Sequence, residues 1–132
     1  MKRKGLQFER DLIHALWENG FAAVRVAGSG SATYPSPDIV ASNGKTIIAI
    51  EAKVREKLPL YISGEKVREL AMFSTLFGAK PVIALKLKKT RWRFFEIDML
   101  EKTENGYKIS DRTFHLGKEL GEILDRFVQE RL

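Results

Sequence analysis

Cysteine is absent from the 132-residue sequence, and histidine (two residues) and proline (four residues) are scarce. The absence of cysteine excludes a disulfide framework, a thiolate zinc site and a cysteine nucleophile. The two histidines, His14 and His115, lie far apart in the sequence and are not expected to share a site. Any metal site must therefore be built from oxygen ligands.

Long apolar runs are missing as well, since none approaches the roughly 20 residues that span a bilayer. The N-terminal segment Met1–Lys4 is basic, but the polar, amphipathic residues that follow do not fit a signal peptide. This length fits one domain. We therefore expect a single soluble domain over residues 1–132, located in the cytoplasm, with no membrane partner.

Basic residues are in excess and unevenly distributed. The formal net charge is +6, and the pI is about 9.7. Residues 56–95 contain nine basic and three acidic side chains, a net charge of +6, whereas residues 96–132 contain six basic and nine acidic ones. Such a basic segment favours a polyanionic partner such as nucleic acid. The alternative is a solvated surface that is basic without having a partner.

Hydrophobic periodicity predicts three helices around a mixed β-sheet, an α/β fold. Asn43-Gly44 between two apolar runs predicts a hairpin. Glycines at positions 20 and 78 are expected to end the first two helices. The expected elements are helices over residues 5–19 and 63–77, strands over 21–26, 38–41, 46–50, 82–87 and 92–97, a small hairpin at Asn105-Gly106, and a C-terminal helix whose apolar side runs from Leu116 to Val128.

Glu9 lies near the middle of the apolar arc of the first helix. Leu6 precedes it by three residues and Ile13 follows it by four, so all three share one side. A carboxylate there is at least partly buried, which is costly without a cation or good hydrogen bonds. Two explanations stay open: an ion pair with a residue such as Arg25, or a role in a metal site.

The predicted hairpin brings a second set of charged residues together. With a two- or four-residue turn centred on Asn43-Gly44, the numbers of any two residues that face each other sum to 87. Asp38 then faces Ala49 and is diagonal to Glu51. Lys53 lies on the same face, because side chains two residues apart share a face. Two acids and a lysine at the end of a buried strand predict either a metal site or an internal Glu51–Lys53 ion pair.

Oxygen ligands of this kind suit Mg²⁺ or Mn²⁺. Such an ion polarises a phosphodiester and lowers the pKa of a bound water, and an adjacent ammonium group stabilises the transition state. The sequence therefore favours metal-dependent hydrolysis of a phosphodiester.

Pro37-Asp38, twelve residues, then Glu51-Ala52-Lys53 form the PD-(D/E)xK pattern of metal-dependent nucleases. In addition, the chain resembles the archaeal Holliday-junction resolvases over its whole length, most clearly over residues 4–53. The motifs that occur in the order and spacing of that family are Lys4-Gly5, Glu9-Arg10, Gly20-Phe21, Val24-Arg25, Ser29-Gly30-Ser31 and Pro37-Asp38-Ile39.

This resemblance implies a restriction-endonuclease-like central mixed β-sheet flanked by helices. It implies a homodimeric nuclease that cuts four-way DNA junctions with Mg²⁺, with Mn²⁺ as a substitute and no small-molecule cofactor. The substrate would be the DNA of the nucleoid. One departure is that residues 32–36 contain no Lys or Arg, so Tyr34 is expected to pack on DNA instead.

The resemblance also assigns roles to individual residues. Glu9, Asp38 and Glu51 would be the metal-site acids, with the backbone carbonyl of Ala52 as a further ligand and Lys53 as the catalytic lysine. Ser29 matches a loop serine needed for activity. The remaining candidates would contact DNA: Lys2, Arg3, Lys4, Arg10, Arg25 and Ser31.

Two other functions stay open. One is another PD-(D/E)xK endonuclease, restriction-like or mismatch-directed, although such enzymes need base readout or a specificity domain for which this chain has little room. The other is a non-catalytic DNA-binding protein of the same fold, which the intact set of four chemical positions disfavours.

The second helix predicts how a dimer would form. Val67, Leu70, Ala71 and Phe77 make one apolar stripe, which is enough to cover a sheet. Apolar surface beyond such a stripe is typical of an interface. The expected interface residues are Met72, Phe73 and Leu76. The alternative is that the small hairpin or the last helix covers these three residues within one chain.

Overall fold

The structure, a computed structural model, describes residues 2–28 and 33–130, with side chains from Gly5 onward. Among the described residues, no helix is long and apolar enough to cross a bilayer. The elements are α1 (Lys2–Glu18), β1 (Ala22–Arg25), β2 (Ile39–Ser42), β3 (Ile47–Arg55), β4 (Leu60–Ser63), α2 (Gly64–Phe77), β5 (Ala79–Leu87), β6 (Arg93–Phe95), η1 (Ile97–Met99), β7 (Glu101–Lys102), β8 (Gly106–Ile109), η2 (Phe114–Leu116) and α3 (Leu120–Glu130).

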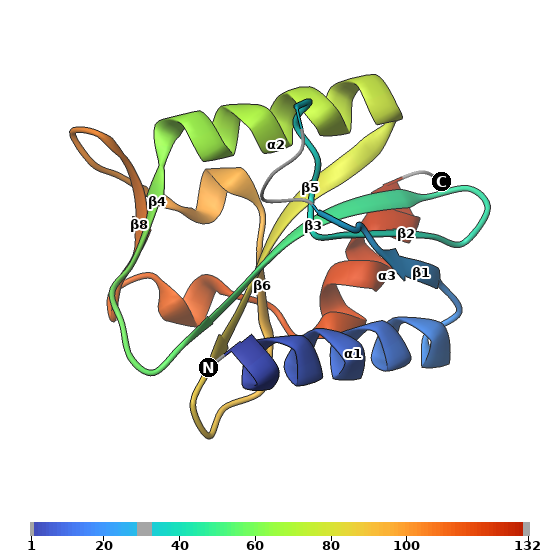
Figure 1. The fold of residues 1–132 in the computed structure, drawn as a ribbon, viewed down its shortest axis with the longest axis horizontal. Coiled ribbons are helices and arrows are strands. Elements are labelled where there is room, and N and C mark those ends of the chain that lie inside the picture. Colours follow the sequence, from blue (N-terminus) through green and yellow to red (C-terminus); the bar gives the residue numbers. More distant parts are fainter. Residues whose placement is uncertain (1, 29–32, 131–132) are drawn as a thin grey trace.

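A five-stranded mixed sheet forms the centre of the molecule, in the order β1-β2-β3-β5-β6 (Figure 1). Strands β3 and β5 are parallel, and the other neighbours are antiparallel. The chain passes from β3 to β5 through β4 and α2, as a parallel pair requires a crossover. The predicted α/β class, a mixed sheet flanked by helices, is confirmed.

Helices cover both faces of this sheet. Leu16 of α1 and Phe127 of α3 are buried in one core with Ile50 of β3. Leu70 of α2 belongs to a second core, which includes Ala49 of the same strand. Strand β3 therefore contributes side chains to both cores, which explains its nearly continuous apolar sequence.

The ends of α2 form as the sequence predicts. Ser63 adopts an extended conformation before the helix, and its Oγ accepts a hydrogen bond from the backbone N–H of Lys66 at 3.1 Å. Gly78 has φ +75°, and its N–H donates to the carbonyls of Ser74 and Thr75. The helix is thus bounded by a hydroxyl cap and a left-handed glycine.

The turn after β2 has four residues, one of the two expected lengths, but it is centred one residue later than expected, which corrects the predicted register. Asn43 Oδ1 accepts hydrogen bonds from the backbone N–H groups of Lys45 and Thr46, so four residues, 43–46, connect the strands. Ile39 pairs with Ile50, and opposed positions sum to 89 rather than 87. Because the shift is an even number of residues, the predicted sharing of a face is preserved.

Strand β4 and its sheet were not predicted. Leu60 and Ile62 are buried while Tyr61 and Ser63 are exposed, so the two-residue alternation of a half-buried strand is present. Strand β4 pairs with β8, and β8 pairs with β7, which makes a second, three-stranded sheet. The predicted small hairpin at Asn105-Gly106 is part of this sheet.

Two predictions about apolar side chains were wrong. Phe77 was assigned to the core stripe of α2, but it is 48% exposed, because it lies in the last turn of α2, beyond Leu70 and Ser74, its last buried residues. Leu116 was assigned to the C-terminal helix, yet that helix begins at Leu120, and Leu116 is exposed in the short helix η2. Gly117, extended, separates the two helices.

Candidate active site

Strands β2 and β3 bring Asp38 and Glu51 to one place. Asp38 directly precedes β2, and the β2–β3 register continues to place it opposite Glu51 rather than diagonal to it. The backbone N–H of Asp38 donates to the carbonyl of Ile50 at 2.9 Å, which ties this corner to β3. The Oδ2 of Asp38 accepts a hydrogen bond from the backbone N–H of Ala52, also at 2.9 Å. The backbone N–H and the side-chain carboxylate of Asp38 are therefore both hydrogen-bonded to β3.

Lys53 lies beside Glu51 on the same face of β3, as predicted. The Nζ of Lys53 is 3.3 Å from Oε2 of Glu51, and the Glu51 side chain is only 10% exposed. The internal ion pair that was considered as an alternative is thus present. The strand continues past its predicted end to Arg55, so Glu51 lies in the middle of β3. A nearly buried carboxylate there is unusual, however, and is typical of functional sites.

Glu9 reaches the same region from α1. Its Oε1 is 3.4 Å from Nε of Arg25 on β1, so the ion pair with Arg25, one of the two explanations left open, is present. Burial and the nearby Asp38 carboxylate both raise the pKa of Glu9, whereas Arg25 lowers it. The charge of Asp38 acts on both Glu9 and Glu51, so the three predicted acids lie within electrostatic range of one another.

The acidic centre costs stability, because burial and the Asp38 carboxylate raise the pKa of Glu51, while Lys53 and Lys66 act in the opposite direction. A carboxyl whose pKa is higher in the folded state than in the unfolded state destabilises the fold above both values. Without metal, we expect Glu51→Gln to raise the melting temperature by a few degrees at pH 7.5. The gain should shrink as the pH falls through the raised pKa toward the ordinary value of 4.5. Thermal unfolding in EDTA across this pH range is the measurement.

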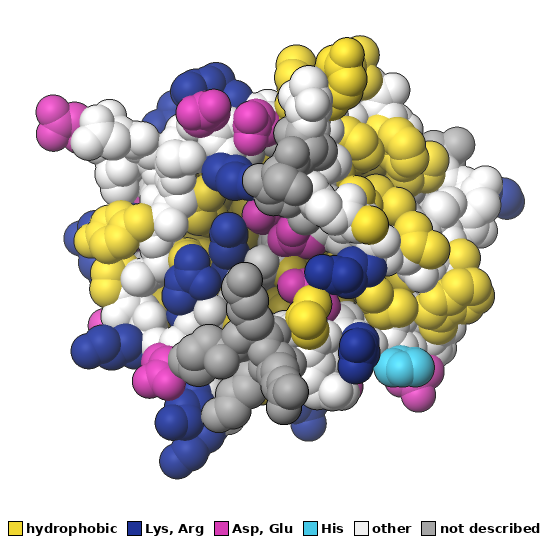
Figure 2. All heavy atoms as spheres, in the orientation of Figure 1, with side chains coloured by type: hydrophobic (Ala, Val, Ile, Leu, Met, Phe, Trp, Pro, Cys, Tyr) yellow, Lys and Arg dark blue, Asp and Glu magenta, His cyan; other side chains and the backbone are white. Residues whose placement is uncertain are grey.

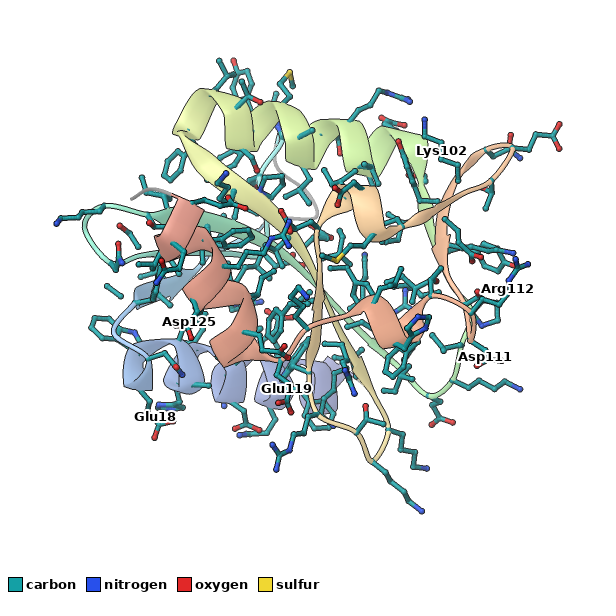
Figure 3. All side chains as sticks on the ribbon, turned by 180° about the vertical axis from the view of Figure 1, so that it is seen from behind. Glu18, Lys102, Asp111, Arg112, Glu119 and Asp125 are labelled. Atoms are coloured by element: carbon teal, nitrogen blue, oxygen red, sulfur yellow. The ribbon has the colours of Figure 1, made fainter. Side chains whose placement is uncertain are left out.

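The exposed Glu18 at the end of α1 offers a matched control, since Glu18→Gln makes the same chemical change away from the acids (Figure 3). A lower melting temperature for Glu51→Gln at pH 7.5 would mean that the charge of Glu51 stabilises the fold.

The carboxylate oxygens of Glu9, Asp38 and Glu51 are ligands of the kind that a divalent cation prefers. In the observed side-chain conformations, however, they do not surround a common point. Among the described residues, no three His, Asp or Glu side chains form a group that could hold a metal ion. Glu9 pairs with Arg25 and Glu51 with Lys53, so a cation would compete with these partners. It would also offset the two causes that raise both glutamate pKa values, which are burial first and repulsion by Asp38 second. Mg²⁺ prefers such oxygen ligands.

Ala52 has the orientation that a backbone ligand needs. Its N–H points to Asp38. In an extended strand the N–H and C=O of one residue point to the same edge. The Ala52 carbonyl therefore also points to the edge of β3 along which Asp38 lies.

The other predicted residues are only partly described. Arg10 is exposed on α1, and Tyr34 is exposed beyond β1. The positions of Ser29 and Ser31 lie outside the described residues, and so do the side chains of Lys2, Arg3 and Lys4. Their assigned roles stay predictions.

One charged neighbour of the site was missed. Lys66 lies in the first turn of α2, and its charge lowers the pKa of Glu51. The sequence places Lys66 in the first turn of the helix that is predicted to start at Ser63-Gly64. Its nearness to Glu51 depends on how α2 packs, which no local pattern reveals.

Charge is distributed differently over the two faces of the molecule. Figure 2 shows acidic side chains at the centre of the front face with basic side chains on both sides of them. In the view from behind, Glu119 directly precedes α3, Asp125 lies on α3, and Glu18 lies at the end of α1 (Figure 3). A polyanion would therefore approach the front face, where basic residues surround the acids.

An apolar patch lies beside this region, over the end of α2 and the outer face of β1 and β2 (Figure 2). Met72 and Leu76 are 50% and 83% exposed, and Val24 of β1 is also exposed. A shallow hollow of about 240 Å³ connects the two parts, with Phe77 and Val40 in its lining. We call these five residues the apolar patch. By contrast, the predicted interface residue Phe73 is partly buried in the second core.

Comparison with known proteins gives a consistent result. The family model described as archaeal Holliday junction resolvase (hjc) matches residues 1–132. The crossover junction endodeoxyribonuclease Hjc of Archaeoglobus fulgidus is 53% identical over 131 residues, covering 99% of this chain and 96% of that protein. The crossover junction endodeoxyribonuclease Hje of Saccharolobus solfataricus is 33% identical over 131 residues, covering 97% and 94%.

A solved structure is also similar. The structure of Archaeoglobus fulgidus Hjc, described as a Holliday junction resolvase from an archaeal hyperthermophile, matches with a TM-score of 0.89 and 51% sequence identity. The match covers 92% of this chain and 98% of that chain. The likeness therefore extends over fold and sequence together.

Proposed function

The chain belongs to the archaeal Holliday junction resolvase family, and on this premise we propose how its residues carry out the reaction. It is a crossover junction endodeoxyribonuclease with a restriction-endonuclease-like fold, and it cuts four-way DNA junctions. The proposal is that residues 1–132 act as one Mg²⁺-dependent nuclease domain, with Mn²⁺ as a substitute. Two copies make paired incisions in junctions of the chromosomal DNA, in the cytoplasm.

One observation supports the chemistry above all others: Asp38, Glu51 and Lys53 converge where β2 and β3 meet. Asp38 is held by the Ala52 N–H at 2.9 Å, and Lys53 lies 3.3 Å from Glu51. The acidic and basic residues of the PD-(D/E)xK pattern thus lie together in the fold, beside a basic surface.

Each of these residues has a role in the proposed reaction. Glu9, Asp38, Glu51 and the Ala52 carbonyl would hold Mg²⁺. When bound, this ion polarises the phosphodiester and lowers the pKa of a water molecule. The Lys53 ammonium, released from Glu51, stabilises the negative charge that develops on the phosphate. The Ala52 N–H keeps the Asp38 carboxylate oriented toward β3.

Basic residues around the acids hold the DNA. Arg10 and Arg25 are placed on α1 and β1 next to Glu9, where they can contact phosphates on either side of the scissile bond. Lys2, Arg3, Lys4 and Ser31 extend this grip, whereas Ser29 is a serine that is needed for cleavage itself. Phosphate contacts carry no sequence information, which suits a nuclease that recognises the shape of a junction.

The apolar patch supports a homodimer. Monomeric proteins rarely expose large contiguous apolar surface, and here α2 leaves the outer face of β1 and β2 uncovered among the described residues. A four-way junction has approximate two-fold symmetry, and an isologous dimer would present two sites with matching symmetry.

The experiment that tests this function compares three DNA substrates of related sequence: a four-way junction, a linear duplex and a mismatched duplex. With Mg²⁺ or Mn²⁺, we expect cleavage of the junction at least about 100-fold faster than either duplex, which corresponds to about 2.7 kcal/mol of discrimination. In EDTA, cleavage should stop. Preferred cutting of the mismatched duplex would favour a mismatch-directed nuclease, and binding without any cleavage would favour a non-catalytic DNA-binding protein.

A further inference from the structure

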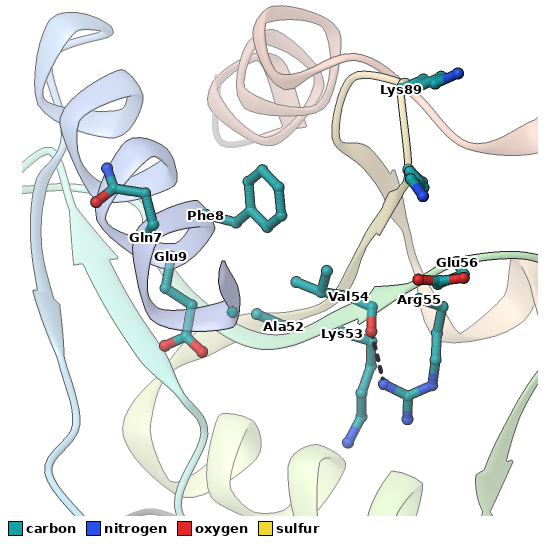
Figure 4. Close-up of a pocket in the computed structure, with 11 residues that line it drawn as sticks. Gln7, Phe8, Glu9, Ala52, Lys53, Val54, Arg55, Glu56 and Lys89 are labelled. Carbon is teal, nitrogen blue, oxygen red and sulfur yellow. Dashed lines mark hydrogen bonds between the residues drawn. The ribbon is translucent and has the colours of Figure 1, made fainter. Parts of the chain in front are cut away.

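A groove beside the acids extends beyond the residues that were assigned to the chemistry above. It lies between the N-terminal part of α1 and the ends of β3 and β5, and its volume is about 450 Å³ (Figure 4). Pockets that bind small molecules have volumes of about 300–1,000 Å³. Glu9, Ala52 and Lys53 belong to the lining of this groove, so it opens directly from the proposed site.

The groove is apolar at its base and basic along its edge. Phe8 of α1 and Val54 of β3 are half-buried and project into it (Figure 4). Arg55, Lys88 and Lys89 are exposed around it. Glu56 is the acid at its outer end. Among the described residues, neither Lys88 nor Lys89 has an ion-pair partner at salt-bridge distance.

The walls of the groove are tied together before any ligand arrives. The Nζ of Lys86 lies 4.8 Å from the centroid of the Phe8 ring and donates hydrogen bonds to the carbonyls of Leu87 and Thr90. The turn after β5 is thereby attached to α1. Lys89 in this turn has φ +65°, a conformation that non-glycine residues adopt rarely and that clusters at functional sites.

Building on the proposed function, we propose that this groove binds one unstacked nucleotide of the cleaved strand, next to the scissile phosphate. Its base packs against Phe8 and Val54, and its outer phosphate is held by Lys88 and Lys89. Apolar and aromatic surface inside a basic edge is how proteins bind unpaired nucleotides. Unstacking is cheapest where base pairing is already disturbed, as it is at the branch point of a junction.

The direct test uses 2-aminopurine, whose fluorescence rises when it leaves the base stack. Junctions carry this base at one of the two nucleotides that flank the mapped cut phosphate, or three nucleotides further along the same arm as a control. They are bound to the unsubstituted protein in EDTA. We expect a several-fold rise at one flanking position and no rise at the control position.

If neither flanking position responds while the protein binds the junction and cuts it in Mg²⁺, the nucleotide subsite is wrong and the proposed function stands. A protein that neither binds nor cuts the junction contradicts the proposed function itself.

Two variants test the apolar floor of the groove and its basic edge separately. Val54→Phe fills the groove without changing charge, and it should abolish the fluorescence rise while junction affinity changes less than about threefold. Lys88→Ala with Lys89→Ala should lower the slope of log affinity against log salt by about 2 for each protomer, or about 4 for the dimer, as expected for two lost phosphate contacts in each copy. The matched control is Lys45→Ala with Lys102→Ala, which removes two exposed lysines from the β2–β3 turn and from β7. If this control lowers the slope as much as the groove variant does, Lys88 and Lys89 do not hold a phosphate.

Discussion

Asp38→Asn is expected to abolish junction cleavage and to leave junction binding nearly intact. Asparagine keeps an oxygen that can accept the Ala52 N–H hydrogen bond, so the corner between β2 and β3 should fold as before. What is lost is the negative charge that would hold Mg²⁺. Removing about 4 kcal/mol of transition-state stabilisation slows a reaction by roughly three powers of ten. Single-turnover cleavage rates and gel-shift affinities in EDTA give the two quantities separately.

The same comparison extends to the neighbouring residues. Glu51→Gln should behave like Asp38→Asn, and Lys53→Ala should lose cleavage while keeping metal binding. Asp125→Asn, on α3 and on the opposite face of the molecule, is the matched control and should cut normally (Figure 3). If Asp38→Asn or Glu51→Gln cuts junctions at the normal rate in Mg²⁺, the acids do not form the metal site.

A second large effect is expected from the apolar patch. Met72→Glu with Leu76→Glu introduces two carboxylates on the exposed side of α2, and an isologous interface would bring both copies of each charge together. The variant should sediment as a folded monomer at micromolar concentration. It should nick one strand of a junction instead of making paired incisions. Analytical ultracentrifugation, circular dichroism and a supercoiled cruciform plasmid, which distinguishes nicked from linear products, are the measurements.

The choice of these two residues follows from the structure. Phe73 is partly buried and stacks on Phe77 with ring centroids 4.9 Å apart, so its substitution would disturb folding and association together. Tyr61→Glu with Leu116→Glu replaces two exposed hydrophobic residues outside the patch and should leave the dimer unchanged. If the unsubstituted protein is a monomer at micromolar concentration and still makes paired cuts, the dimer model fails.

Local patterns in the sequence predicted the parts of the fold that depend on neighbouring residues. The cap at Ser63 and the left-handed Gly78 bound α2 where the sequence placed its ends. The hairpin shows the limit of such reasoning. Its turn type was uncertain, and side-chain hydrogen bonds of Asn43 select a four-residue connection that shifts the register by two. The shared face of Asp38 and Glu51 survived because an even shift preserves it.

Features that depend on distant packing were missed. Strand β4 is four residues long and gains its partner from β8, more than 40 residues later. Lys66 approaches Glu51 only because α2 crosses the sheet between β3 and β5. The groove at Phe8 needs the turn after β5 to reach α1. The alternation that marks β4 extends over only four residues. The other two contacts leave no periodic trace in the sequence near the residues concerned.

The order in which the acidic centre can assemble follows from the sheet topology. Asp38 and Glu51 face each other across a hairpin, so their backbone pairing closes a loop of only a dozen residues. The burial of Glu51, by contrast, needs β5, whose pairing begins with Ile47 and Ala79 on either side of the α2 crossover. Contacts over such separations form late, because the entropy of closing the chain is lost before they can stabilise it. In a nascent chain the two acids can therefore meet in water, while the largely buried environment of Glu51, close to Lys53 and Lys66, exists only once the sheet is complete.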